Sequence, residues 1–146
     1  MNHPLLFLLL SLASPALAAE RVPYTFDNVT LVECIDGDTC RFDFHETHPV
    51  LGKVTFHGHV VRLADVDTPE SYRPECEAER ELGDRAKDYA EALLRGARRI
   101  TVVVLMKGRY GRLIARVLAD GVDVSQALIE EGLGRPYDGG KRKSWC

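Results

Sequence analysis

The chain has 146 residues, enough for one compact domain with a single core and too few for two. Hydrophobic residues make up 45% and charged residues 28%, which excludes a disordered or fibrous chain. The net charge of −3 argues weakly against a nucleic-acid partner, but the charge is unevenly distributed. Residues 19–94 hold 8 basic and 17 acidic side chains, whereas residues 95–146 hold 11 basic and 5 acidic. Because binding follows local patches, this pattern is compatible with phosphate contacts beside a cation site.

The first eighteen residues are typical of a secretory signal peptide. An apolar run at residues 5–10 precedes small residues and an Ala-Leu-Ala site at residues 16–18. The run is shorter than the roughly 20 apolar residues that span a bilayer. We expect cleavage after Ala18 or Ala19, a secreted or periplasmic product, and no membrane span once residues 1–18 are removed. No Lys or Arg precedes the run, so an N-terminal strand or core helix and a retained anchor stay open as alternatives.

Four cysteines follow the expected cleavage site: Cys34, Cys40, Cys76 and Cys146. An even number in an exported chain predicts two disulfides, and four cysteines allow three connectivities. We expect Cys34–Cys40 across a turn and Cys76–Cys146, which would fasten the tail to the domain. Four reduced thiols are the alternative.

The first half of the remaining chain is predicted to consist of strands. They are expected at residues 28–35, 39–44 and 54–64, with an Asp-Gly-Asp turn making a hairpin of the first two. A polar stretch at residues 45–53 is expected to separate this hairpin from the third strand. Pro69 and Pro74 bracket a loop, because proline fixes φ and restricts the residue before it.

The second half is predicted to contain the helices. Residues 75–99 have apolar positions at helical spacing, acidic residues near the start and arginines near the end. Gly83 weakens the first turns by roughly 1 kcal/mol relative to Ala, so the regular helix is expected to begin there. Further strands are expected at residues 100–105 and 113–118, and a short helix capped by Asp123 or Ser125. The order strands, helix, strands, helix suits an α+β fold with a small closed barrel.

Three segments bring together the residue types needed for phosphodiester chemistry: Asp-Gly-Asp-Thr at residues 36–39, residues 62–70 where a strand ends in a loop, and Tyr-Gly-Arg at residues 110–112. Each alone is commonly a turn or a loop start. Together they offer carboxylate oxygens for a hard cation such as Ca²⁺. They also offer two arginines to bind a phosphate and a carboxylate to activate or orient water.

In this order, and followed by Asp-Gly-x-x-Val-x-x-x-Leu-x-x-x-Gly at residues 120–132, the segments resemble the staphylococcal nuclease (thermonuclease) family over residues 29–135. The resemblance implies a five-stranded oligonucleotide-binding barrel with flanking helices. It implies Ca²⁺ bound by Asp38, Asp67 and the carbonyl of Thr68. It also implies Glu70 as the general base, Arg62 and Arg112 on the scissile phosphate, and Arg109 and Tyr110 on a nucleotide phosphate. Arg109 replaces a more usual lysine.

Three features depart from the family pattern. The 24 positions from Asp38 to Arg62 are longer than usual and include His45, His48, His57 and His59. These histidines suggest either a metal site or an exposed, variable hairpin tip, and we favour the tip. Tyr137 lies near a position where the family stacks a base, but in a shifted register. Asp65 either positions the metal ligands without binding the ion itself or, as we favour, is an ordinary exposed side chain.

The sequence thus predicts one nuclease-like domain at residues 19–146, with its core at 29–135 and a basic tail at 136–146. The expected function is that of a secreted, monomeric, calcium-dependent nuclease of DNA and/or RNA with little sequence specificity, leaving 3′-phosphate ends. Two alternatives remain: a non-catalytic nucleic-acid-binding module of the cell envelope, and a metal-buffering envelope protein suggested by the histidines. Nuclease assays with and without chelator discriminate between them.

Overall fold

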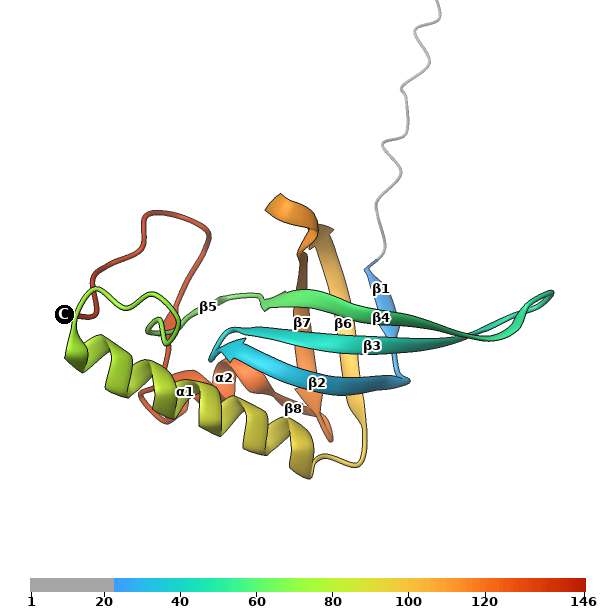
Figure 1. The fold of residues 1–146 in the computed structure, drawn as a ribbon, viewed down its shortest axis with the longest axis horizontal. Coiled ribbons are helices and arrows are strands. Elements are labelled where there is room, and N and C mark those ends of the chain that lie inside the picture. The colour runs from blue at the N-terminus through green and yellow to red at the C-terminus, as the bar shows by residue number, and fades with distance from the viewer. Residues whose placement is uncertain (1–22) are drawn as a thin grey trace, which may run out of the picture.

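A computed structural model describes residues 23–146, so the expected signal peptide, its cleavage site and their alternatives lie outside the described range. The described chain is built on one main sheet with the strand order β1-β6-β7-β4-β3-β2, and β8 pairs with β7 (Figure 1). Its strands are β1 (Tyr24–Phe26), β2 (Val29–Asp36), β3 (Thr39–His48), β4 (Gly52–Leu63), β6 (Ile100–Lys107), β7 (Leu113–Ala119) and β8 (Val122–Asp123).

The five longer strands have the order of an oligonucleotide-binding fold. Neighbours pair antiparallel except β4 and β7, which run parallel with Arg62 opposite Ile114. The predicted α+β class is therefore confirmed. The closed barrel expected from the sequence is corrected: among the described residues the sheet is not closed by hydrogen bonds, because β1 pairs with the edge of β6 that could otherwise meet β2.

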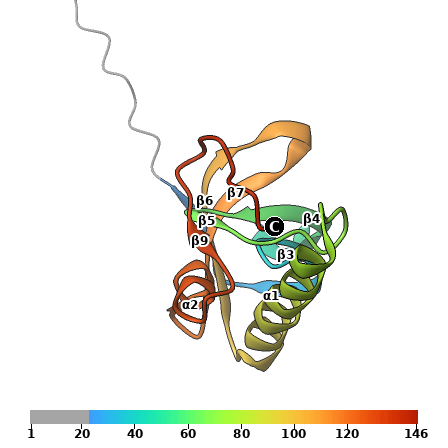
Figure 2. The same ribbon diagram turned by 90° about the vertical axis from the view of Figure 1, so that its left-hand side faces the viewer.

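Two helices cover the sheet: α1 (Glu77–Gly96) packs along β2, and α2 (Val124–Glu130) packs on β7 (Figures 1 and 2). Asp123 caps α2, accepting hydrogen bonds from the N–H groups of Ser125 and Gln126 at 2.9 and 3.3 Å. A second, two-stranded sheet joins β5 (Val66–Asp67) to β9 (Arg135–Pro136), and η1 (Arg109–Gly111) is a single 3-10 turn. Among the described residues, we find no helix whose length and apolar content would suit a membrane crossing.

Gly83 does not mark the start of the helix, contrary to expectation, because α1 begins at Glu77 and continues through it. Gly83 is buried where the helix meets the preceding loop. A Cβ at this position would lie 2.6 Å from the carbonyl oxygen of Glu70 and 2.9 Å from the nitrogen of Ser71. The glycine is therefore required for close contact between helix and loop.

The polar stretch at residues 45–53 is not a separate loop, which corrects a second expectation. β3 continues to His48 and β4 begins at Gly52, so the two strands form a long arm that projects beyond the rest of the sheet (Figure 1). Polar cross-strand contacts support the arm, including His45 to Thr55 at 3.0 Å and His57 to Asp43 at 2.9 Å. Because both faces of such a strand meet water, its sequence lacks the apolar alternation that identifies strands.

Both expected disulfides are present. Cys34–Cys40 joins β2 to β3 beside the Asp-Gly-Asp turn, and Cys76–Cys146 joins the start of α1 to the C-terminal end. The first braces the turn that carries Asp38. The second brings the tail beside the loop at residues 69–74.

Candidate active site

Asp38 is held rigidly in the turn between β2 and β3. Its carboxylate is buried, with the residue 4% exposed, and accepts hydrogen bonds from the backbone N–H of Thr68 at 2.9 Å and the hydroxyl of Thr39 at 3.0 Å. The turn rests on α1, because a Cβ on Gly37 would lie 2.7 Å from the Cβ of Ala86. This carboxylate is therefore preorganised.

Asp67 and Thr68 follow the end of β4. Asp67 is 3% and Thr68 1% exposed, and β5 fixes them by pairing with β9. The hydroxyl of Ser125 in α2 donates to the carbonyl oxygen of Ala64 at 2.8 Å, which supports the same loop from the other side. The loop thus places Asp67 beside Asp38, from a different strand of the sheet.

Arg62 lies between the two aspartates. Its guanidinium pairs with Asp38, lies 3.8 Å from an oxygen of Asp67 and donates to the carbonyl oxygen of Val66 at 3.2 Å. The ring of Tyr137 lies under it, with the guanidinium carbon 5.7 Å from the ring centre. Arg62 therefore lies at the centre of the group that the sequence predicts.

Glu70 follows Pro69 in the loop that contacts Gly83. Its backbone N–H donates to Glu79 at 3.2 Å, and its side chain is 31% exposed. Burial raises the pKa of Glu70 above its ordinary value, and the charges of Asp36 and Asp38 raise it further, although the hydrogen bond from Arg142 acts in the opposite direction. A carboxylate with a raised pKa is a stronger base than a free one.

Arg142 is the residue that the sequence analysis did not assign to the site. Its guanidinium binds the carboxylates of Asp67 and Glu70, and it donates to the carbonyl oxygen of Thr68 at 2.9 Å. Burial lowers the pKa of Arg142, but the bond to Glu70 and the charge of Asp67 outweigh it and raise the pKa overall. One feature of the sequence could have indicated this position of Arg142. The expected Cys76–Cys146 disulfide places the residues just before Cys146 near Glu70.

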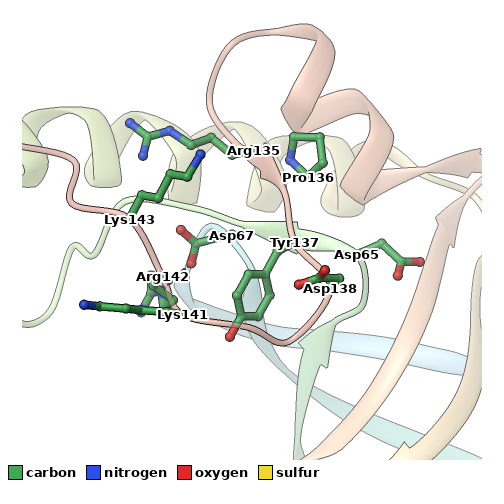
Figure 3. Close-up of a pocket in the computed structure, with 9 residues that line it drawn as sticks. All are labelled: Asp65, Asp67, Arg135, Pro136, Tyr137, Asp138, Lys141, Arg142 and Lys143. Atoms are coloured by element: carbon green, nitrogen blue, oxygen red, sulfur yellow. Dashed lines mark hydrogen bonds and ion pairs between the residues drawn. The ribbon is translucent and has the colours of Figure 1, made fainter.

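The tail also forms the wall of a cavity of about 670 Å³, lined by Arg142 and eight further residues that include Asp65, Asp67 and Lys141 (Figure 3). Trp145 donates from Nε1 to Asp67 at 3.1 Å, and the guanidinium of Arg135 lies 3.5 Å above the Trp145 ring. Asp65 points away from Asp67 and its exposed carboxylate lies 3.8 Å from Arg116, as the favoured alternative predicts.

Arg112 lies directly before β7, two residues before Ile114. Because Ile114 pairs with Arg62 in a parallel register and side chains alternate, Arg112 emerges on the same face of the sheet as Arg62. Arg109 and Tyr110 lie on the η1 turn, where Tyr110 is 93% exposed with a φ of 57°. Among residues 23–146, no hydrogen bond or ion pair connects these three with the site carboxylates, so their roles remain predictions.

The site's donor set suits a hard cation. Asp38, Asp67 and the Thr68 carbonyl contribute only oxygen atoms, and the Arg142 cation already lies against Asp67 and this carbonyl. The hydroxyl of Thr68 is buried without a hydrogen-bond partner among the residues described. The residues expected to bind Ca²⁺ therefore fit a cation by charge and by ligand type.

A second acidic group, Glu75 and Glu79 beside Cys146, also has metal-ligand spacing. The sulfur of Cys146 is in a disulfide, and Glu79 accepts hydrogen bonds from the N–H groups of Glu70 and Glu75 at 3.2 and 2.6 Å. These contacts give Glu79 a structural role, since they fix the loop that carries Glu70.

The family described as "Staphylococcal nuclease homologue" matches residues 60–144. The chain belongs to the staphylococcal nuclease family. The match begins at the end of β4 and includes Arg62, Asp67, Thr68, Glu70 and Arg112, together with the tail that carries Arg142.

Three endonucleases are also similar to this chain. It is 34% identical to the SPbeta prophage-derived endonuclease YokF of Bacillus subtilis, over 74% of this chain and 33% of that protein. It is 35% identical to endonuclease YncB of the same organism, over 74% of this chain and 47% of that protein. An uncharacterized endonuclease of Escherichia coli O157:H7 is 29% identical over 53% of this chain and 46% of its own length. The chain thus spans a third to a half of these relatives.

Proposed function

We propose that this protein is a calcium-dependent nuclease that hydrolyses phosphodiester bonds of DNA and/or RNA with little sequence specificity. One observation carries the proposal: Asp38, Asp67 and Glu70 come together from two loops beside Arg62 of β4, and the cation of Arg142 already binds two of these carboxylates. Membership of the nuclease family and the endonuclease names of its relatives support it. We further propose that residues 19–146 form one monomeric domain, released from residues 1–18 by signal cleavage.

In the proposed mechanism each residue has a separate task. Asp38, Asp67 and the Thr68 carbonyl would hold Ca²⁺, which supplies Lewis-acid stabilisation of the phosphate and lowers the pKa of bound water. Glu70 orients the attacking water and accepts its proton. Arg62 and Arg112, on one face of the sheet, donate to the phosphate oxygens and stabilise the charge of the five-coordinate transition state. By family resemblance, the products carry 3′-phosphates.

The ligand set also predicts the compartment in which the protein works. With two protein carboxylates on the ion, the Kd for calcium should be near the roughly 10⁻⁴–10⁻³ M of extracellular modules. Such an enzyme would be active in a secreted or periplasmic setting and nearly inactive in the cytoplasm. The two disulfides are compatible with that setting.

Digestion of single- and double-stranded DNA and RNA, with calcium and then with chelator, tests the proposal. We expect cleavage that requires calcium, and Glu70→Gln should bind DNA yet cut poorly. Glu131→Gln, a matched change on the exposed end of α2, should cut at the parent rate. Cleavage that survives chelation, or an active Glu70→Gln, would contradict the assignment.

One observation favours the alternative of a binding module without catalysis: Arg142 already engages the carboxylates of Asp67 and Glu70. The same assay separates the two functions, because a binding module would retain DNA without producing fragments at any calcium concentration.

A further inference from the structure

The C-terminal tail, residues 136–146, lies across the carboxylates that the proposed nuclease needs (Figure 3). Resting on that function, we propose that the tail is an intramolecular plug: the Arg142 guanidinium competes with a metal cation for Asp67, Thr68 and Glu70. The proposal concerns the regulation of the site and adds no catalytic step.

Both carboxylate oxygens of Asp67 are occupied by side chains of the tail. One of its carboxylate oxygens binds Arg142 and the other accepts the indole N–H of Trp145 at 3.1 Å. The Thr68 carbonyl and Glu70 are engaged by the same guanidinium. A cation that takes Asp67 and Thr68 as ligands must therefore compete with Arg142, because the guanidinium nitrogens already contact these oxygens and repel a second positive charge at contact distance.

The tail is anchored on both sides of Arg142. Cys146 is joined to Cys76 at the start of α1, and the Ser144 carbonyl accepts a hydrogen bond from Arg135 at 3.0 Å. On the other side, the Tyr137 hydroxyl donates to the Gly140 carbonyl at 2.8 Å. Arg142 is thus held between two fixed points. A tethered group of this kind acts at a high effective concentration, in the millimolar range for short flexible linkers.

Because the tail and the metal compete for the same oxygens, docking of the tail affects binding of the metal and binding of the metal affects docking of the tail. Each weakens the other by the same factor, because both draw on one set of oxygens. A plug that is closed about nine-tenths of the time would raise the apparent Kd for calcium about tenfold. Opening the Cys76–Cys146 tether should reduce this effect, since the tail would then lose its anchor.

Calcium titration of the whole chain by calorimetry tests the inference. We expect Arg142→Gln to bind calcium at least about tenfold more tightly than the parent. Lys143→Gln is the matched control: it removes the same charge from the same cavity, but Lys143 has no hydrogen bond or ion pair to the site in the described residues. Its Kd should stay within about twofold of the parent. A Cys76→Ser/Cys146→Ser variant should lie between the parent and Arg142→Gln.

Trp145 supplies a readout that is independent of nuclease activity, because it is the only tryptophan of the chain. In the parent, saturating calcium should shift its emission as the indole leaves Asp67, and Asp38→Asn should abolish the shift. Thermal melts of each variant without calcium confirm that the fold is intact.

The outcomes separate this inference from the proposed function. Equal calcium affinity in parent and Arg142→Gln, with unchanged Trp145 emission, would overturn the plug and leave the calcium site standing. Weaker binding by Arg142→Gln would also overturn it, since Arg142 would then support the ion. Binding in none of the variants would overturn the calcium site and the plug together.

Discussion

Arg62 and Arg112 have the same proposed task on the phosphate but different surroundings in the free protein. Arg62 is 16% exposed in its side chain and paired with Asp38, whereas Arg112 has no ion pair among the described residues. Removing one partner of a buried pair leaves an uncompensated charge. The two arginines therefore offer a means to separate catalysis from stability.

We expect Arg62→Ala and Arg112→Ala each to lower kcat about 10²–10³-fold, the usual effect of losing one transition-state donor. Arg62→Ala should also lower the free energy of unfolding by on the order of 3 kcal/mol, while Arg112→Ala should leave it nearly unchanged. Steady-state kinetics and denaturant unfolding measure the two effects. Equal stability losses would show that Arg62 has no special structural role.

The grouping of Asp38, Asp67 and Arg62 could be predicted from sequence because their motifs, taken together and in order, resemble the staphylococcal nuclease family, which assigns all three to one site. A turn fixes Asp38, and the end of a strand fixes Arg62 and Asp67. The position of Arg142 could not be predicted from sequence, because the tail has no local pattern of its own. Its place depends on the disulfide at Cys146 and on the register of β9 with β5.

At the scale of elements, α1 acts as a platform for both loops of the site. Gly83 faces the Glu70 loop and Ala86 faces Gly37 in the Asp38 turn, so small side chains let the two loops approach the helix. The helix thus determines the position of Glu70 relative to Asp38. A larger side chain on this face should move the loop before it unfolds the protein.

Gly83→Ala tests this platform. The change should favour the helix by about 1 kcal/mol in intrinsic propensity, yet its Cβ would lie 2.6 Å from the Glu70 carbonyl oxygen. We expect kcat to fall while α1 remains helical by circular dichroism. Gly96→Ala, on the same helix with no atom within 4 Å of its added Cβ, should keep parent activity. An active Gly83→Ala enzyme would show that the loop can adapt.

The cap of α2 has a different role, because this short helix supports the Asp67 loop through Ser125. Asp123→Ala removes two capping hydrogen bonds and should cost about 1 kcal/mol of stability. Asp123→Asn keeps a capping oxygen and should cost less. Thermal unfolding measures both, and equal losses would place the effect of Asp123 in its contact with Arg116, 3.5 Å away.

The elements that sequence patterns missed have two physical causes, exposure on both faces or very short length. The outer part of the β3–β4 arm meets water on both sides, and β5 and β9 are only two residues long. Hydrophobic periodicity cannot indicate such strands. The longer strands that line the core were predicted well, because Phe42, Val61, Val102 and Val117 alternate with more exposed neighbours.

At the scale of the whole molecule, the net charge of −3 conceals a division between an acidic first half and a basic second half. The basic residues include Arg109 on the η1 turn, Arg112 directly after it and Lys141–Lys143 in the tail. Contacts from such side chains go mainly to phosphates, which carry no sequence information. We therefore expect little preference between oligonucleotide sequences.

Binding of inactive Glu70→Gln to a single-stranded oligonucleotide should weaken steadily as salt rises. Arg109→Ala should reduce the slope of log K against log salt by about one if Arg109 contacts a phosphate. Fluorescence anisotropy at several salt concentrations measures both. Affinity that is indifferent to salt, or a sharp sequence preference, would contradict phosphate-based recognition.

The β3–β4 arm divides the polypeptide between the two sides of the active site. A single cut at its exposed tip, between Val50 and Leu51, would leave Asp38 on one fragment and Asp67 with Glu70 on the other. Each disulfide lies within one fragment, so non-covalent contacts would hold the pieces together, among them the pairing of β3 with β4 and of β1 with β6 and the packing of β2 on α1. The arm is therefore a suitable site at which to split the proposed nuclease for a complementation assay. We expect neither fragment to cleave DNA alone, and we expect mixing the two fragments to restore cleavage.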